Sequence, residues 1–131
     1  MVIDTSALFA IEFAEPEGAL FAAAVKSAPR RLMSTATAVE CVSVFAGRRP
    51  GVDPMIAFND QIGELAIEIT PVDLPQWRAA SEALIRFGKG RHPARLNLGD
   101  SFAYALAKVT GEPLLCKGAD FAHTDIRLAS A

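Results

Sequence analysis

The chain opens with MVIDTSAL (residues 1–8), and this stretch decides how the rest of the sequence is interpreted. Val2 and Ile3 are apolar and β-branched, which suits a short strand buried on both faces of a parallel sheet. Asp4, Thr5 and Ser6 follow directly, and an apolar helical segment begins behind them. A strand that passes into a helix in this way predicts an open α/β sheet. In such sheets, ligands bind beyond the carboxyl ends of the strands.

The composition narrows the class of protein. With 131 residues, 51% of them hydrophobic, and a mean hydropathy of +0.26, we expect one well-filled domain over residues 1–131. No apolar run reaches the length of about 18 residues that spans a bilayer, and no signal peptide is evident, so we expect a soluble, cytoplasmic protein. Cys41 and Cys116 lack metal-ligand spacing and are interpreted as reduced core residues.

The charge balance bears on possible partners. The formal net charge is −2 and the sequence pI is about 5.6. Proteins that hold nucleic acid through phosphate contacts alone are usually basic, so the charge disfavours that partner. The objection weakens if a bound metal ion supplies positive charge at the site.

Strand and helix patterns alternate along the chain. Apolar segments at 2–3, 32–34, 67–70 and 113–116 predict strands, with 126–128 as a last edge strand. Thr37 and Glu40 have capping-box spacing, and Asp53 and Asp73 precede further helical patterns. We expect Val39 and Trp77 to face the core. The predicted fold is α/β, with a short, mainly parallel sheet flanked by helices on both faces.

Four acidic residues occupy comparable places in this pattern. Asp4 and Asp120 come just after strands, whereas Glu40 and Asp100 lie in the first turns of helices. Strand ends and the helix starts that follow them share one rim of a parallel sheet, so the four acids can meet there. Clustered carboxylates repel one another unless a cation neutralises them, and oxygen ligands suit Mg²⁺ or Mn²⁺. Each acid also has a purely structural alternative, as a helix cap, a dipole partner or a turn residue.

Several segments together resemble one known family. These are residues 1–8, the helix-borne Glu40, LNLGDSFAYALA (residues 96–107) and KGADFAHTDI (residues 117–126). They resemble PIN-domain ribonucleases, and most closely the VapC toxins of bacterial type II toxin–antitoxin operons. The segments fall in the family's order and extend over nearly the whole chain.

The resemblance implies specific roles. Asp4, Glu40, Asp100 and Asp120 match the family's acidic quartet around a divalent metal, with Asp4 and Asp100 as direct ligands. Glu40 would complete the first metal site or orient its water, and Asp120 would act through water. The expected supporting residues are Thr5, Ser6 and Asp125. Related sequences often carry Asp or Asn where this chain has Ala119.

The function implied by the resemblance is a toxin with Mg²⁺- or Mn²⁺-dependent endoribonuclease activity on RNA. The expected partners are a second copy of the chain and a small VapB-type antitoxin, which would block the acidic pocket. We assign surplus apolar residues on the first two helices to such contacts: Leu8, Phe9, Phe13, Leu20, Phe21 and Val25. The alternative for Phe9, Phe13 and Phe21 is that they fill a core between these two helices. Lys89, Arg91 and Arg95 are candidate RNA contacts, with a solvated loop as the alternative. The neighbouring His92 shows no sign of acting as a general base.

Two other classes of function remain open at this point. A PIN-like fold can serve as a non-catalytic interaction module, although such a module has no need for four crowded acids. A receiver or phosphotransferase domain also places acids at strand ends. A phosphotransferase of the haloacid dehalogenase type would carry a second Asp where Ser6 stands, and a receiver would carry paired acids before its phosphorylated Asp.

Overall fold

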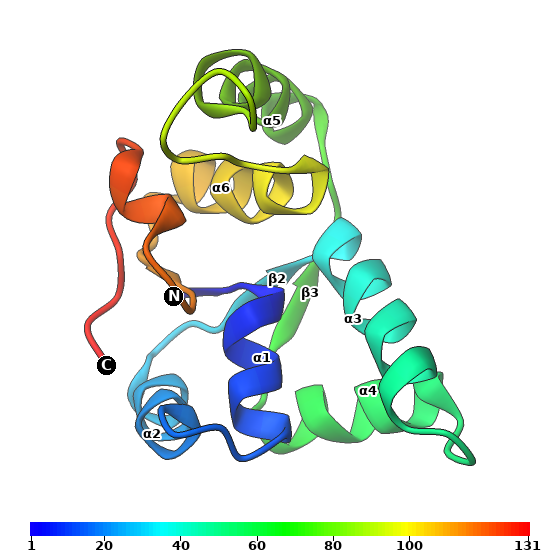
Figure 1. Cartoon of the computed structure of the whole chain (residues 1–131). Helices are drawn as coiled ribbons and strands as arrows, with labels where there is room; N and C mark the ends of the chain where they lie inside the picture. Colours follow the sequence, from blue (N-terminus) through cyan, green and yellow to red (C-terminus); the bar gives the residue numbers. More distant parts are fainter.

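The computed structural model describes all 131 residues and contains a four-stranded parallel sheet (Figure 1). The strands pair in the order β3-β2-β1-β4. They are β1 (Val2–Ile3), β2 (Leu32–Ser34), β3 (Glu68–Thr70) and β4 (Leu114–Leu115). The helices are α1 (Thr5–Glu12), α2 (Gly18–Ser27), α3 (Thr35–Arg48), α4 (Pro54–Glu64), α5 (Leu74–Phe87), α6 (Leu98–Thr110) and the 3₁₀ helix η1 (Asp120–His123). The predicted α/β architecture is confirmed.

Successive side chains on the short strands point to opposite faces of the sheet and fill two separate cores. Ile3 and Met33 pack with the cluster formed by α1, α2, α3 and α4. Val2 and Leu32 pack with the cluster formed by α5 and α6. Figure 1 shows α5 and α6 stacked on one side of the sheet and the first four helices on the other. Helices on both faces leave the two ends of the strands as the accessible edges.

Helix starts follow the predicted caps with one exception. The side chains of Asp53 and Asp73 accept backbone hydrogen bonds at the starts of α4 and α5, as expected. The capping box predicted at Thr37 is wrong, because α3 begins at Thr35 with Ser34 as its N-cap. Ser34 ends β2 and caps α3 with no intervening loop, so Glu40 lies in the second turn of the helix rather than the first.

Some apolar residues lie on unexpected sides. Val39 is 71% exposed and Trp77 is 56% exposed, so neither faces the core. The early helices, in contrast, expose only one of the apolar residues that we expected on a contact surface. Leu8, Phe9 and Val25 are buried, Phe13 and Phe21 are half-buried, and Leu20 is exposed. The segment at 126–128 forms an isolated parallel bridge to β4 instead of a strand.

Two further features match the sequence pattern. Both cysteines are free thiols, and Cys41 is buried as expected. None of the helices combines the length and the apolar character that a membrane crossing needs.

Candidate functional site at the carboxyl edge of the sheet

Asp4 lies directly after β1 and caps α1. One carboxylate oxygen of Asp4 accepts hydrogen bonds from the Ser6 backbone N–H, at 3.0 Å, and from the Ser6 hydroxyl, at 2.5 Å. The Ser6 hydroxyl oxygen in turn accepts from the Lys117 backbone N–H at 2.9 Å. Burial raises the pKa of Asp4, and the hydrogen bonds from Ser6 offset part of that rise. Asp4 is therefore a buried, oriented carboxylate, and Ser6 supports it as predicted.

Glu40 reaches the same place from α3. Its Oε2 accepts a hydrogen bond from the Thr5 hydroxyl at 3.0 Å. The same oxygen lies against the Gly99 backbone, since a Cβ built on Gly99 would be 2.5 Å from it. Real Cβ atoms do not approach an oxygen so closely. Gly99 thus leaves the space that the Glu40 carboxylate occupies between the starts of α1 and α6.

Asp100 lies in the first turn of α6. Asn97 and Asp100 form a complete capping box, in which Asp100 Oδ2 accepts from the Asn97 N–H at 2.8 Å. Burial, together with the negative charges of Asp4, Glu40 and Asp120, raises the pKa of Asp100 to about 6. The structural and the functional interpretations of Asp100 are therefore compatible. One oxygen forms the cap, and the other accepts no hydrogen bond from the protein.

Asp120 is the first residue of η1, in the exposed turn after β4. It forms no hydrogen bond or ion pair, but its charge acts on both Asp100 and Cys116. Burial raises the pKa of the Cys116 thiol to about 12, with Asp4, Asp100 and Asp120 adding to the rise. These mutual effects indicate that the strand-end and helix-start acids lie near one another.

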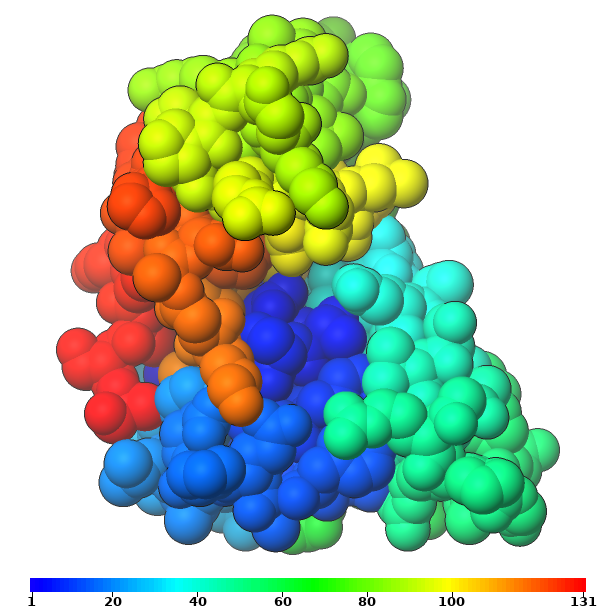
Figure 2. Space-filling view, viewed as in Figure 1, coloured from blue at the N-terminus to red at the C-terminus, as the bar shows by residue number.

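A hollow marks this edge of the molecule (Figure 2). The start of α1, in blue, forms its floor, and the turn after β4, in orange, forms one wall. The opposite wall is α3, and the start of α6 lies above. No three Asp, Glu, His or Cys side chains converge closely enough to hold a metal ion by themselves. The hollow is therefore an open acidic pocket rather than a closed metal cage.

Asp125 lies in a different environment from the four acids. Its carboxylate accepts hydrogen bonds from the Tyr104 hydroxyl at 2.7 Å, from Lys108 at 2.9 Å and from Arg86 at 3.2 Å. The Tyr104 and Lys108 hydrogen bonds lower the pKa of Asp125 to about 2. None of these contacts connects Asp125 to the acidic pocket. Asp125 fastens the segment after η1 to α5 and α6.

The basic segment predicted as an RNA contact forms the loop between α5 and α6. Lys89, Arg91 and Arg95 are exposed on it, and none of them forms an ion pair. His92 packs edge-on against Phe87, and its Nδ1 accepts from the Ala94 N–H at 3.1 Å. His92 therefore has a structural role in the loop, in keeping with the sequence interpretation.

Sequence reasoning missed two contributors to the pocket. The first is Gly99, for which a glycine beside a candidate acid at a helix start is the available sign of close packing. The second is Lys117. Its backbone N–H holds Ser6, and its ammonium pairs with Glu15 and Glu17 at 2.5 and 2.8 Å. No pattern in the sequence links residues so distant along the chain.

The chain is similar to known proteins over nearly its whole length. The family model of the PIN domain matches residues 1–127. The chain belongs to the PIN domain family. Ribonuclease VapC42 of Mycobacterium tuberculosis is 42% identical over 131 residues, which cover 98% of each chain. Ribonuclease VapC of Mycolicibacterium smegmatis is 46% identical over 128 residues, 96% of this chain and 97% of that one.

A solved PIN-domain toxin has the same fold. Crystalline VapC20 of Mycobacterium tuberculosis, described as a sarcin-ricin loop cleaving toxin, superposes with a TM-score of 0.69 at 17% identity. The match covers 96% of this chain and 98% of that one. With membership of the PIN family shown, the receiver and phosphotransferase alternatives fall away.

Proposed function

We propose that this PIN domain, spanning residues 1–131, is the toxin of a type II toxin–antitoxin pair and cleaves RNA phosphodiester bonds with Mg²⁺ or Mn²⁺. The observation that carries the proposal is the set of four acids at one edge of the sheet, none of which has a cationic partner within the protein. The near full-length similarity to proteins named VapC ribonucleases supports the same activity. A non-catalytic module would have no use for unpaired, partly buried carboxylates.

The residues present fit a hydrated divalent cation. Mg²⁺ is usually held by one or two carboxylates and keeps several waters, so a pocket without a three-ligand cage suits it. Asp100 and Glu40 each have one oxygen that accepts no hydrogen bond from the protein, and the buried carboxyl group of Asp4 lies at the same edge of the sheet. A bound cation would relieve the repulsion that raises the pKa of Asp100.

The protein side chains have separable roles in this proposal. Asp4 and Asp100 would hold the metal, which would supply an activated water and stabilise the leaving oxygen. Glu40, fixed by Thr5 and Gly99, orients water from the α3 wall. Asp120 is exposed and unpaired at the rim of the pocket, so it acts through water. Ser6 keeps Asp4 in one orientation by donating to it.

The partners follow from the family. The substrate is RNA, and the inhibitor is a small VapB-type antitoxin that blocks the pocket. An antitoxin arginine would match the unpaired carboxylates because a guanidinium binds such groups through two parallel hydrogen bonds. A homodimer is part of the proposal. Exposed apolar residues on α3 and α4, such as Val39, Met55 and Ile56, are better candidates for these contacts than the buried face of α1.

The test is RNA cleavage by the purified chain with Mg²⁺ or Mn²⁺, in the presence and absence of EDTA. Asp4→Asn keeps the shape of the side chain but removes its charge, so we expect cleavage to be nearly abolished while the fold is retained by circular dichroism. The matched control is Asp60→Asn, an exposed acid on α4. Cleavage that persists in EDTA or in the Asp4→Asn variant would overturn the proposal.

A further inference from the structure

The loop between α5 and α6 concentrates positive charge in an otherwise acidic protein. Lys89, Arg91 and Arg95 are exposed within seven residues of one another, and each lacks an acidic partner. Other exposed cations, such as Lys26, Arg30 and Lys108, are paired with carboxylates. Arg48, Arg78 and Arg127 also lack an acidic partner, but each is isolated along the chain from other unpaired cations. Three neighbouring cations without acidic partners repel one another, and a bound anion would relieve this repulsion. The arrangement therefore favours an anion-binding surface over a merely solvated turn.

The loop is held in one shape by its backbone. Lys89 N–H donates to the Leu96 carbonyl at 3.0 Å, and Leu96 N–H donates to the Phe87 carbonyl at 3.0 Å, which closes the base of the loop. Inside it, the N–H groups of Arg91 and His92 both donate to the Gly88 carbonyl, at 3.1 and 3.2 Å. A ligand that binds such a loop loses less free energy to ordering than one that binds a flexible loop.

The space among these side chains has the size and chemistry of an anion site. An open cavity of about 520 Å³ is lined by the loop alone, from Lys89 to Pro93 together with Arg95, and by no apolar core residue. It contains no carboxylate that would repel an anion. Figure 2 shows the loop, in yellow-green, on the same face as the acidic hollow and directly above it. The chain connects the two sites, since Arg95 lies five residues before Asp100.

We infer that this basic loop binds phosphate groups of the RNA substrate on one side of the cleavage point. It rests on the proposed ribonuclease function and adds a second site to it. The acidic pocket repels RNA, so affinity has to come from elsewhere on the same face. The loop supplies it through charge and holds the strand so that it crosses the pocket. Because the contacts go to phosphates, the loop contributes affinity and register but no base preference.

The first experiment measures binding without cleavage. The Asp100→Asn variant is used as the background, with a fluorescent RNA that the wild-type chain cleaves, and the dissociation constant is followed from 50 to 200 mM salt. Each phosphate contact with single-stranded RNA contributes about 0.7 to the slope of log Kd against log salt. Replacing Lys89, Arg91 and Arg95 by Ala should therefore lower the slope by about 2 and weaken binding about tenfold or more at low salt. Arg78→Ala, which removes an exposed, unpaired cation from α5, should change the slope by less than about 0.3.

The second experiment measures turnover with Asp100 intact. The triple Ala variant should raise KM about tenfold and leave kcat within about twofold, because the lost contacts bind substrate and transition state equally. Arg91→Lys with Arg95→Lys keeps the charge and should restore most of the affinity. An RNA shortened to the nucleotides next to the cleaved bond should be cut equally by the wild-type chain and the triple variant.

The outcomes separate this inference from the function on which it rests. If the wild-type chain cleaves no RNA, the proposed function fails. If it cleaves RNA while the triple variant keeps the wild-type KM and salt slope, the loop inference is overturned and the function stands. The loop inference is also overturned if the triple variant binds RNA normally but loses affinity for the antitoxin, since the loop would then be a docking site for an acidic peptide.

Discussion

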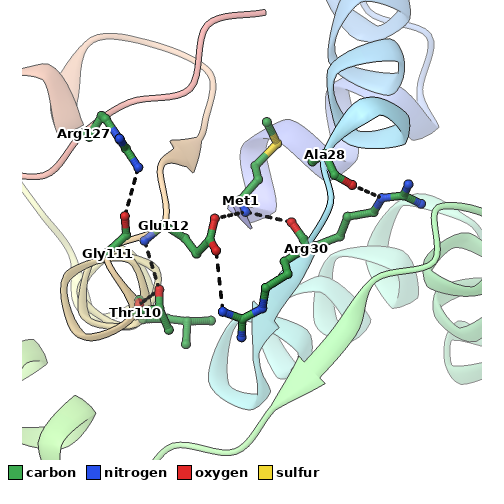
Figure 3. A network of polar contacts seen from close by, with 9 residues as sticks. Met1, Ala28, Arg30, Thr110, Gly111, Glu112 and Arg127 are labelled. Carbon is green, nitrogen blue, oxygen red and sulfur yellow. Dashed lines mark hydrogen bonds and ion pairs between the residues drawn. The ribbon is translucent and has the colours of Figure 1, made fainter.

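The carboxylates at the two edges of the sheet lie in opposite electrostatic environments. At the amino edge, Glu112 precedes β4 and accepts a hydrogen bond from the Met1 amino group at 2.6 Å, with the Arg30 guanidinium at 3.6 Å (Figure 3). At the carboxyl edge, Asp4 and Asp100 have no cation near them. The hydrogen bond from Met1 lowers the pKa of Glu112, whereas burial and neighbouring acids raise the pKa of Asp100 to about 6.

This difference separates stability from function within one small domain. A carboxylate whose pKa is lowered on folding stabilises the folded state at neutral pH, and one whose pKa is raised destabilises it. The amino edge therefore contributes to holding the strands together. The carboxyl edge carries acidic groups whose raised pKa values lower the free energy of unfolding. Groups with such perturbed pKa values are typical of ligand-binding and catalytic sites. Substitutions at the two edges should accordingly have opposite signatures.

The largest effect is expected for Asp100→Asn. Cleavage should be nearly abolished, because the amide cannot supply the charge that holds the metal. Stability at pH 7 should be unchanged or higher, since the buried charge is removed while the amide oxygen can still accept from Asn97. The measurements are RNA cleavage and thermal unfolding of the same preparation. A variant that loses activity together with several degrees of melting temperature would show that Asp100 is mainly a structural cap.

A smaller effect is expected for Gly99→Ala. The added methyl group would collide with the Glu40 carboxylate, which is the free end of a flexible side chain and can move away. Alanine also favours a helix over glycine by up to about 1 kcal/mol, so stability should stay level or rise. Cleavage should fall about tenfold to a hundredfold, as for the loss of a group that orients a metal ligand.

A double variant makes this prediction specific. Glu40→Asp shortens the side chain by one methylene and should relieve the collision, so Gly99→Ala with Glu40→Asp should cleave at least as well as Glu40→Asp alone. If the Gly99→Ala defect simply adds to that of Glu40→Asp, the two residues act independently and the positioning role of Gly99 is wrong.

Much of the fold could be predicted from the sequence because local signals are strong there. The VI pair before Asp4, the Asp53 and Asp73 caps and the helix start that carries Asp100 each depend on a few adjacent residues, and all of them are observed. The start of α3 was misplaced because Ser34 both ends β2 and caps the helix. A strand and a helix that share one residue leave no loop for a pattern to detect.

The acids of the candidate site and its hydroxyl supports, Thr5 and Ser6, could be predicted from the sequence, whereas its other supports could not. Asp4 and Asp120 follow strands and Asp100 lies in the first turn of a helix, and these positions share one edge of a parallel sheet. Glu40 reaches the same edge from the second turn of α3. The contacts of Gly99 with Glu40 and of Lys117 with Ser6 join distant segments, so they depend on packing. The environment of Asp125 was not predictable either. Its place in the motif indicated a support for the acidic pocket, but its partners are Tyr104, Lys108 and Arg86.

The amino edge should respond to Glu112→Gln with a loss of stability alone. Removing the charge from a half-buried network should cost about 1 kcal/mol, or a few degrees in melting temperature, and leave cleavage unchanged. Because the pKa of Glu112 is lowered in the folded state, its contribution is present above its unfolded pKa, about 4.3, and is lost as the pH falls through the lower folded value. The wild-type chain and the variant should therefore differ in denaturant unfolding at pH 7 and converge well below pH 4. A gap that persists at low pH would point to lost packing instead.

The smallest effect is expected for Lys117→Met, because Lys117 fastens the turn that carries Asp120 to neighbouring segments. Lys117 pairs with Glu15 and Glu17, but its side chain is 46% exposed, so these ion pairs contribute little to stability. Lys117→Met leaves the backbone hydrogen bond to Ser6 in place and loosens only the outer side of the turn. We expect kcat at saturating RNA to fall about twofold at 20 mM salt and to match the wild-type value at 0.5 M, where the ion pairs are screened in both proteins. Lys26→Met removes the same charge from a pair with Glu64 and should leave kcat unchanged at either salt concentration. If Lys117→Met and Lys26→Met behave alike at low salt, the Lys117 ion pairs do not position Asp120, and Ser6 alone links the turn to the pocket.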